Sequence, residues 1–479
     1  MVLRFILPLC LLAPIAAPAG AVSTAELRRH IEILASDGFE GRAPATRGER
    51  KTTDYIVGQL KAIGAEPAGT GGSWYQPVPL TERKAHRHAA VFSASGRKLD
   101  LRDDSMILFG RSGSESIAGA PVVFAGYGTG AADLAGAVAL ILYDAPGESV
   151  PAFSERVKAL AARGAAAVIG ITGEDMPWGA VQHYYEGGQH DLSAEARAPV
   201  EGLIGYHEAK RLLAAAGAEG LVDDLPADFA AKPLGITADL AVTTHVRSFT
   251  SNNVVGRLRG SGNGGQAVLY LGHWDHLGQC RPLGAVDRIC NGAVDNASGI
   301  AAMLEIARAF AKGPRPERDI LFLATTAEEM GLLGASEFAA RPPVPLGSIV
   351  AAFNLDTVAI AGKGQKVSVI GRGHASLDAL IDETVRESGR RLAADSGAEQ
   401  MAQRQDGWAL AKAGVPAVVV GGSFSDMRLL GHFLQGPYHG PADSAGDGLI
   451  LEGAAEDAEL LVAIGRKAAD PARYQRPNS

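Results

Sequence analysis

The stretch Ala267-Val268-Leu269-Tyr270-Leu271-Gly272-His273-Trp274-Asp275-His276 places two histidines and a carboxylate directly after a short apolar run. Ala267 to Gly272 has the length and composition of a buried strand. In open α/β sheets, ligands bind beyond the carboxyl ends of the strands. The residues that follow each apolar run are therefore the candidates for a functional site.

Apolar runs alternate with helical patterns from Asn252 onward. Ile300, Leu304 and Ala307 recur at helical spacing and predict a helix over 298–311. Such alternation predicts βαβ units, and hence an α/β fold with a mostly parallel central sheet flanked by helices. Further strands are predicted over 319–325, 349–355 and 417–420, and further helices over 330–340, 377–387 and 451–468.

Histidines and carboxylates follow successive predicted elements. Asp295 precedes a helix, Glu328 and Glu329 follow the second strand, Asp356 follows the third, and His439 stands in a late loop. Each alone has a simpler explanation, such as a helix N-cap or an acidic group complementing a helix dipole. Together they predict a metal site, because nitrogen and oxygen ligands suit Zn²⁺ and bridging carboxylates suit a two-metal hydrolytic centre.

The composition is that of a globular protein. The chain has 479 residues, is 47% hydrophobic and carries a formal net charge of −8. This apolar content is too high for a disordered chain. The acidic balance argues against a nucleic-acid binder, which would carry a basic surplus.

The N-terminal segment has the pattern of a signal peptide over residues 1–21. Arg4 supplies a positive charge, residues 5–17 are apolar, and Ala19-Gly20-Ala21 is a small-residue cleavage site. We therefore expect export to the periplasm or the medium, with cleavage near Ala21. A membrane anchor is the alternative interpretation. No later apolar run is long enough to span a bilayer, so no membrane span is expected in the mature chain.

The polar motifs, in this order, resemble those of the M28 family of zinc-dependent aminopeptidases. The similar strings are His273 to Gly278, Asn291 to Gly299, Ala327-Glu328-Glu329, Asn354-Leu355-Asp356 and Tyr438-His439, together with the early string Leu34 to Arg42. Residues 99–246 have a different sequence pattern, in which short β-like runs alternate with an Ala-rich helix. They resemble a protease-associated domain inserted into a discontinuous catalytic domain of residues 22–98 and 247–479; an unrelated α/β insertion is the alternative.

The resemblance implies two Zn²⁺ ions per chain and peptide substrates with a free N-terminus. It assigns His273 and Asp356 to one zinc, Glu329 and His439 to the other, and Asp295 to both, with a cis peptide bond after Asp295. Glu328 would be the general base. Asp275 would be the acidic residue that orients the His273 ring.

Two departures from the family pattern stand out. Val294 precedes Asp295 where many relatives have an aspartate, and Gln405-Asp406-Gly407 replaces a common Ser-Asp-His. The second segment borders the expected substrate pocket, so the substrate preference cannot be carried over from the family.

Cys280 and Cys290 flank the loop between His273 and Asp295. A free thiol or a zinc thiolate is conceivable for each. Because the five expected metal ligands are complete without sulfur and export favours oxidation, we predict a disulfide.

Other functions remain open at this point. A carboxypeptidase of the same family would need basic residues to bind a substrate carboxylate, and Arg372 and Arg404 are the candidates by position. A non-catalytic binding protein on the same fold would be expected to lack ligands, and none is missing. A single-zinc glutaminyl cyclase fits less well with five ligands and an inserted module.

Overall fold

The computed structural model describes residues 21–476, apart from 132, 145–149, 196, 223–224, 395–396 and 447. The chain forms two compact units, one of Met1–Val78 with Ser251–Ser479 and the other of Pro79–Thr250. Most of the predicted signal peptide lies outside the described residues. Within the described residues, no helix is long and apolar enough to cross a membrane.

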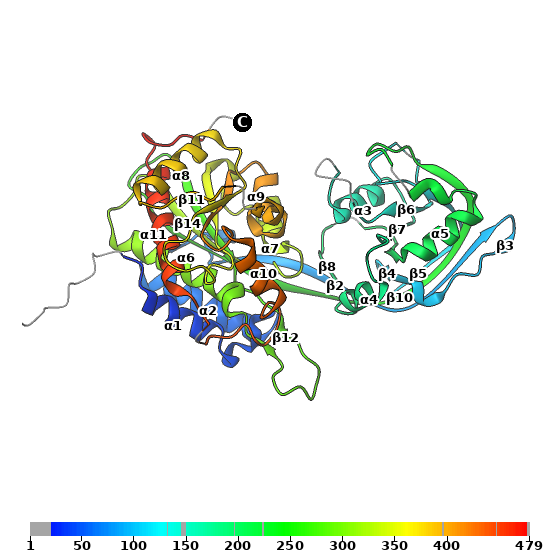
Figure 1. Ribbon diagram of the computed structural model, residues 1–479, viewed down its shortest axis with the longest axis horizontal. Coiled ribbons are helices and arrows are strands. Elements are labelled where there is room, and N and C mark those ends of the chain that lie inside the picture. The colour runs from blue at the N-terminus through cyan, green and yellow to red at the C-terminus, as the bar shows by residue number, and fades with distance from the viewer. Residues whose placement is uncertain are drawn as a thin grey trace, which may run out of the picture. The chain divides into compact units, whose positions relative to one another are not determined.

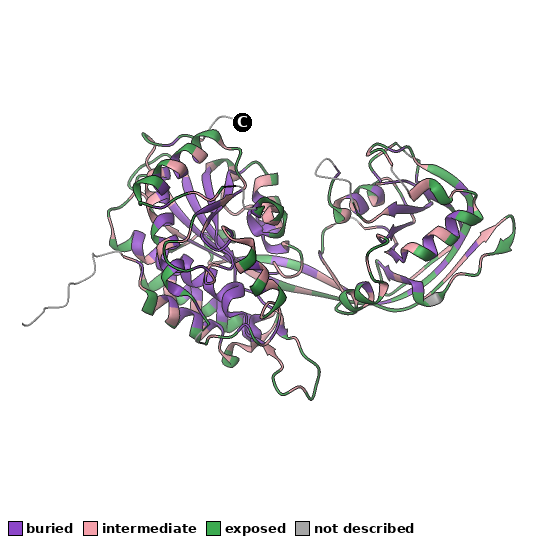
Figure 2. Ribbon diagram, in the orientation of Figure 1, coloured by how far each residue is buried: buried purple, intermediate pink, exposed green. Residues whose placement is uncertain are grey.

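The first unit is built on a mostly parallel sheet in the order β16-β17-β15-β11-β14-β10 (Figure 1). The parallel strands are apolar runs because both faces of the sheet are covered, and they are coloured as buried in Figure 2. Strand β16 is antiparallel to β17, and β10 is antiparallel to β14. The bounds are β10 Lys232–Leu258, β11 Ala267–His273, β14 Asp319–Thr325, β15 Ile349–Asn354, β16 Ser368–Ile370 and β17 Ala417–Gly421.

Alternate residues of these strands pack on opposite faces. Tyr270 and Phe322 join the core formed with α1, α6, α8 and α11, whereas Leu269 and Leu323 join the core formed with α7 and α9. The helices are α1 Thr24–Leu34, α2 Arg47–Ala62, α6 Ser298–Lys312, α7 Leu333–Ala340, α8 Ala375–Glu387, α9 Asp406–Lys412, α10 Met427–Gln435 and α11 Leu451–Ala468. Short strands are β1 Glu66–Pro67, β12 Gly278–Gln279 and β13 Ile289–Cys290.

The start of helix α7 differs from its prediction. The segment expected to be helical from Met330 begins its helix only at Leu333. Gly331 and Leu332 both have positive φ, at 105° and 60°, so the chain turns before the helix can start. Glu328 and Glu329 therefore lie in the turn that follows β14 rather than on the helix.

The second unit has its own core and contains the strands that continue the sheet beyond β10. Strands β5, β6, β7 and β9 run parallel to one another, and β4 is antiparallel to β9. The unit extends beyond the predicted 99–246, because the long strands β2 and β10 enter and leave it. Its likeness to a protease-associated domain stays a prediction. The elements are β2 Tyr75–Ala94, β3 Arg97–Lys98, β4 Met106–Gly110, β5 Ser114–Phe124, β6 Val138–Leu142, α3 Phe153–Ala162, β7 Ala167–Ile171, α4 Trp178–Glu186, β8 Gln189–Leu192, β9 Val200–Ile204 and α5 Tyr206–Ala215.

Candidate metal centre

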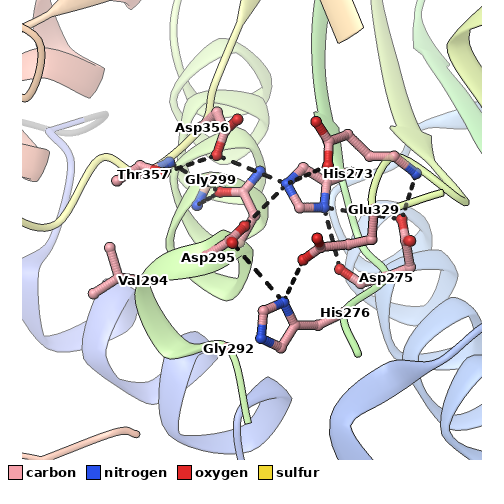
Figure 3. Close-up of polar contacts among 12 residues, drawn as sticks. His273, Asp275, His276, Gly292, Val294, Asp295, Gly299, Glu329, Asp356 and Thr357 are labelled. Carbon is pink, nitrogen blue, oxygen red and sulfur yellow. Dashed lines mark hydrogen bonds and ion pairs between the residues drawn. The ribbon is translucent and has the colours of Figure 1, made fainter. Parts of the chain in front are cut away.

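The polar residues predicted from the strand ends meet in the first unit. His273 is the last residue of β11, Glu328 and Glu329 follow β14, and Asp356 follows β15. Because these strands are parallel, their carboxyl ends lie at the same edge of the sheet. Asp295 reaches this edge from the turn before α6 (Figure 3). His439 reaches it from the loop after α10.

Asp295 lies between two groups of potential ligands. Its Oδ1 atom is 3.2 Å from His273 Nε2, which is itself 3.7 Å from Asp356 Oδ1. Its Oδ2 atom is 3.4 Å from His439 Nε2, and that nitrogen is 2.9 Å from Glu329 Oε2. The two carboxylate oxygens of Asp295 thus face different histidines. This is the arrangement that a carboxylate shared by two metal ions would need.

His276 is a further member of this cluster that sequence analysis left without a role. Its Nδ1 atom lies 2.5 Å from Glu329 Oε1 and 4.0 Å from Asp295 Oδ2, and the ring is buried. His276, Asp295 and Glu329 form one of the groups whose ligand atoms could hold a metal ion, and His273, Asp295 and Asp356 form another. The sequence did offer one indication of a role for His276, which is its position directly after Asp275 in the His-Trp-Asp-His string.

The loop carrying Asp295 is held from two sides. The Asp443 carboxylate accepts hydrogen bonds from the backbone amides of Val294 at 2.8 Å and Asp295 at 3.0 Å. The peptide bond between Asp295 and Asn296 is cis, as the family resemblance implied. Gly292 has a φ of 56°, and a Cβ there would lie 2.6 Å from the His276 ring, so only glycine fits.

Asp275 is fully buried beneath the cluster. The His273 Nδ1 atom lies 3.1 Å from the backbone oxygen of Asp275 and 3.8 Å from its carboxylate. The carboxylate accepts a hydrogen bond from the backbone amide of Glu328 instead. The structure therefore links Asp275 both to the His273 ring and to the placement of Glu328.

Burial and mutual charge shift the pKa values of this cluster in opposite directions. Burial raises the pKa of Glu328 well above its ordinary value, and Glu329 and Asp356 add to the rise against the attraction of His273. Burial also raises the pKa of Asp275 to about 8. Burial opposes ionisation of Asp295 as well, but hydrogen bonds from His273 and His439 outweigh it and hold that pKa well below the ordinary value.

A small cavity opens beside the cluster. Asp295, Glu328 and Asp356 line it together with Arg404 and Tyr438. Gln405, from the segment that departs from the family pattern, also lines it and accepts a hydrogen bond from Asn354 at 3.0 Å. The remaining lining residues are Thr357, Met401, Phe424, Leu430 and Leu434, most of them apolar.

The two arginines considered for binding a substrate carboxylate lie at different places in the structure. Arg404 lines this cavity, with its Nη2 atom 3.5 Å from the hydroxyl oxygen of Tyr438. Arg372 does not line it and forms an ion pair with Asp382 at 2.7 Å. Only Arg404 therefore remains a candidate for contacting a substrate.

Comparison with known proteins agrees with this geometry. Residues 253–455, which include every residue of the cluster, match the model of peptidase family M28. Residues 253–455 thus belong to peptidase family M28. An M28 peptidase is a hydrolase that acts on peptide bonds, which fits the strand-end cluster of histidines and carboxylates.

Relatives and solved structures extend the match. A mouse protein named Aminopeptidase NAALADL1 is 35% identical over 111 residues, which cover 22% of this chain and 13% of that protein. A protein of Arabidopsis thaliana named Probable glutamate carboxypeptidase AMP1 is 39% identical over 118 residues, covering 24% of this chain and 15% of that protein. The structure of an aminopeptidase from Aneurinibacillus sp. strain AM-1 shares the fold, with a TM-score of 0.57 and 20% identity over 96% of this chain and 97% of that one.

Proposed function

We propose that this protein is an exported zinc-dependent exopeptidase that hydrolyses the N-terminal peptide bond of peptides. The observation that carries the proposal is the position of Asp295, whose two carboxylate oxygens face His273 and His439. The disulfide between Cys280 and Cys290 supports export, because such bonds persist in oxidising compartments.

The donor set fits zinc. His273, Asp295 and Asp356 would hold one ion, and Asp295, Glu329 and His439 the other. The Nε2 atom of His439 lies 3.4 Å from Asp295 Oδ2 and 2.9 Å from Glu329 Oε2, so the three donor atoms of the second group converge as ligands of one ion would. Bound zinc supplies Lewis acidity, which polarises a carbonyl group and lowers the pKa of water.

Glu328 is placed to act as the general base that accepts a proton from the attacking water. It lines the cavity, and its Oε2 atom lies 3.9 Å from the His273 ring. A carboxylate whose pKa is raised by burial is a stronger base than an exposed one. Glu328 would take a proton from the attacking water and deliver it to the nitrogen of the departing peptide.

Similarity to a protein named as an aminopeptidase supports a preference for a free amino terminus. Asp295 and Asp356 line the cavity as proposed zinc ligands, so bound ions would offset their charge and the lining carboxylates do not decide which end of a substrate enters. The apolar side chains of Phe424 and Leu430 would accept the first side chain of the peptide.

One observation favours a second candidate function. Arg404 lines the same cavity and could contact the terminal carboxylate of a substrate. This would make the protein a carboxypeptidase of the same fold. The two candidates require opposite chain ends to be free, so they can be separated with matched substrates.

The test uses zinc-loaded protein and one short peptide in three forms: unmodified, N-acetylated and C-amidated. We expect cleavage of the unmodified and C-amidated forms and a loss of at least 100-fold on acetylation, since the acetyl group removes the ammonium charge. Cleavage that survives acetylation and is lost on amidation would establish the carboxypeptidase instead. Failure to cleave any of the three would contradict the peptidase proposal.

A further inference from the structure

Arg42 is a buried cation that makes no ion pair within the described residues. Its side chain is among the largest fully buried ones, at 1% exposure. The guanidinium group donates only to backbone carbonyl oxygens. These are the oxygens of Trp274 at 2.9 Å, Leu34 at 2.8 Å, Asn291 at 2.6 Å and Gly292 at 2.8 Å.

Three of these carbonyls belong to the loops that carry the proposed metal ligands. Trp274 stands between His273 and Asp275, at the end of β11. Asn291 and Gly292 begin the turn that leads to Asp295. One rigid guanidinium group therefore joins two ligand-bearing loops that are otherwise separate in the sequence.

The segment around Arg42 is pressed against the same loops. Gly41 and Arg42 have φ values of 65° and 54°, in the left-handed region. A Cβ at Gly41 would lie 2.5 Å from the backbone oxygen of Cys290. The Asn291 side-chain amide donates to Asp37 at 2.9 Å. A conformation that is unfavourable for most residues persists where surrounding contacts determine it.

The charge of Arg42 also bears on the centre. Burial lowers the pKa of Arg42, and attraction to nearby carboxylates opposes that fall. These carboxylates belong to Asp443, Asp295, Asp275 and Glu329. Burying a cation without a carboxylate contact is costly unless its hydrogen bonds are satisfied. Here four backbone carbonyl oxygens satisfy the guanidinium group.

We propose that Arg42 is a positioning residue of the metal centre, which sets zinc affinity by fixing the spacing between the His273 loop and the Asp295 loop. The inference rests on the proposed zinc function. It assigns the N-terminal segment a role in the centre although no proposed ligand comes from that segment.

Arg318 provides a matched control. It is also buried, at 4% exposure, and its Nη1 atom donates to the backbone oxygens of Ala468 and Tyr474. These carbonyls lie in the C-terminal segment, away from the ligand loops. The experiment compares Arg42→Met and Arg42→Lys with Arg318→Met and Arg318→Lys in the full chain. Zinc affinity is measured by chelator competition, the Co²⁺-substituted absorption spectrum reports ligand geometry, and circular dichroism reports folding.

We expect folded Arg42→Met to bind zinc about 10- to 100-fold more weakly, the range seen when groups that support metal ligands are removed. Its Co²⁺ spectrum should change, and Arg42→Lys should recover part of the affinity. The Arg318 variants should keep the wild-type affinity and spectrum, whatever their stability.

Wild-type affinity and spectrum in folded Arg42→Met would overturn the inference. If Arg42→Met does not fold, Arg42→Lys decides: weaker binding than in Arg318→Lys supports the inference, and equal binding overturns it. If neither Arg42 variant folds while both Arg318 variants do, Arg42 serves the fold and the inference is also overturned. Absence of zinc binding by the wild type would instead contradict the proposed function itself.

Discussion

The backbone amide of Glu328 donates a hydrogen bond to the Asp275 carboxylate at 3.2 Å. This contact joins the residues that follow two neighbouring parallel strands, β11 and β14. Asp275 is also 3.1 Å from the His273 ring through its backbone oxygen. One buried residue thus fixes both a proposed metal ligand and the proposed general base.

Replacing Glu328 with glutamine should separate catalysis from metal binding. The variant keeps every proposed ligand, so zinc content should stay at the wild-type level. Turnover should fall about 10²- to 10⁴-fold, the usual contribution of a general base. Zinc analysis and kcat measured on the same preparation check this. Near-normal kcat in the zinc-replete variant would rule out Glu328 as the base.

Replacing Asp295 with alanine should have a different effect, because both ligand groups share this carboxylate. We expect zinc content to fall together with activity. The comparison with Glu328→Gln is informative, since both changes remove one carboxylate from the same cavity. Retention of full zinc content in Asp295→Ala would show that Asp295 is not a shared ligand.

Much of the first unit could be predicted from sequence. The strand over Asp319–Thr325 and the helix over Leu451–Ala468 have the predicted bounds, because continuous apolar runs and helical spacing dominate there. The predicted start of α7 was wrong, because the positive φ angles of Gly331 and Leu332 are a backbone property without a clear sequence pattern.

The convergence of His273, Glu329 and Asp356 could be predicted, because each follows or ends a strand of the same parallel sheet. His276 and Arg42 were missed for a different reason. His276 joins the cluster through its contact with Glu329, which is remote in the sequence. The partners of Arg42 are backbone carbonyl oxygens. Every residue has such a group, so the residue types in the sequence do not indicate these contacts. Such roles depend on the three-dimensional packing of loops.

The Cys280–Cys290 disulfide, predicted from export and now seen in the structure, should support the centre. Cys290 Sγ lies 3.4 Å from the backbone oxygen of His439. Changing both cysteines to serine should lower the free energy of unfolding by about 2–4 kcal/mol and speed zinc dissociation, because the His439 loop loses a neighbour. Denaturant titration and zinc release to a chromophoric chelator measure these effects. An unchanged release rate would show that the bond does not support the metal site.

His30 should make stability depend on pH. Burial is the main cause that lowers its pKa from 6.5 to about 4, and its ring is 3% exposed. Between these values the unfolded state binds a proton that the folded state does not, so stability falls as pH falls. The loss between pH 7 and pH 5 should be roughly 2 kcal/mol.

His30→Gln should remove that part of the pH dependence, and glutamine can still bond to the Tyr55 hydroxyl, which lies 2.6 Å from His30 Nδ1. The measurement is denaturant unfolding at pH 5 and pH 7. His432→Gln, at an exposed position, serves as the control and should behave as the wild type. An equal pH dependence in His30→Gln and wild type would contradict the assignment.

The decisive measurement is titration of metal-free protein with zinc, with bound metal and peptide cleavage followed in the same sample. We predict saturation at two zinc ions per chain, with full cleavage activity only when both are bound, because Asp295 faces two separate histidines. Full activity of protein that contains no zinc, or saturation at a single ion, would contradict a two-zinc centre.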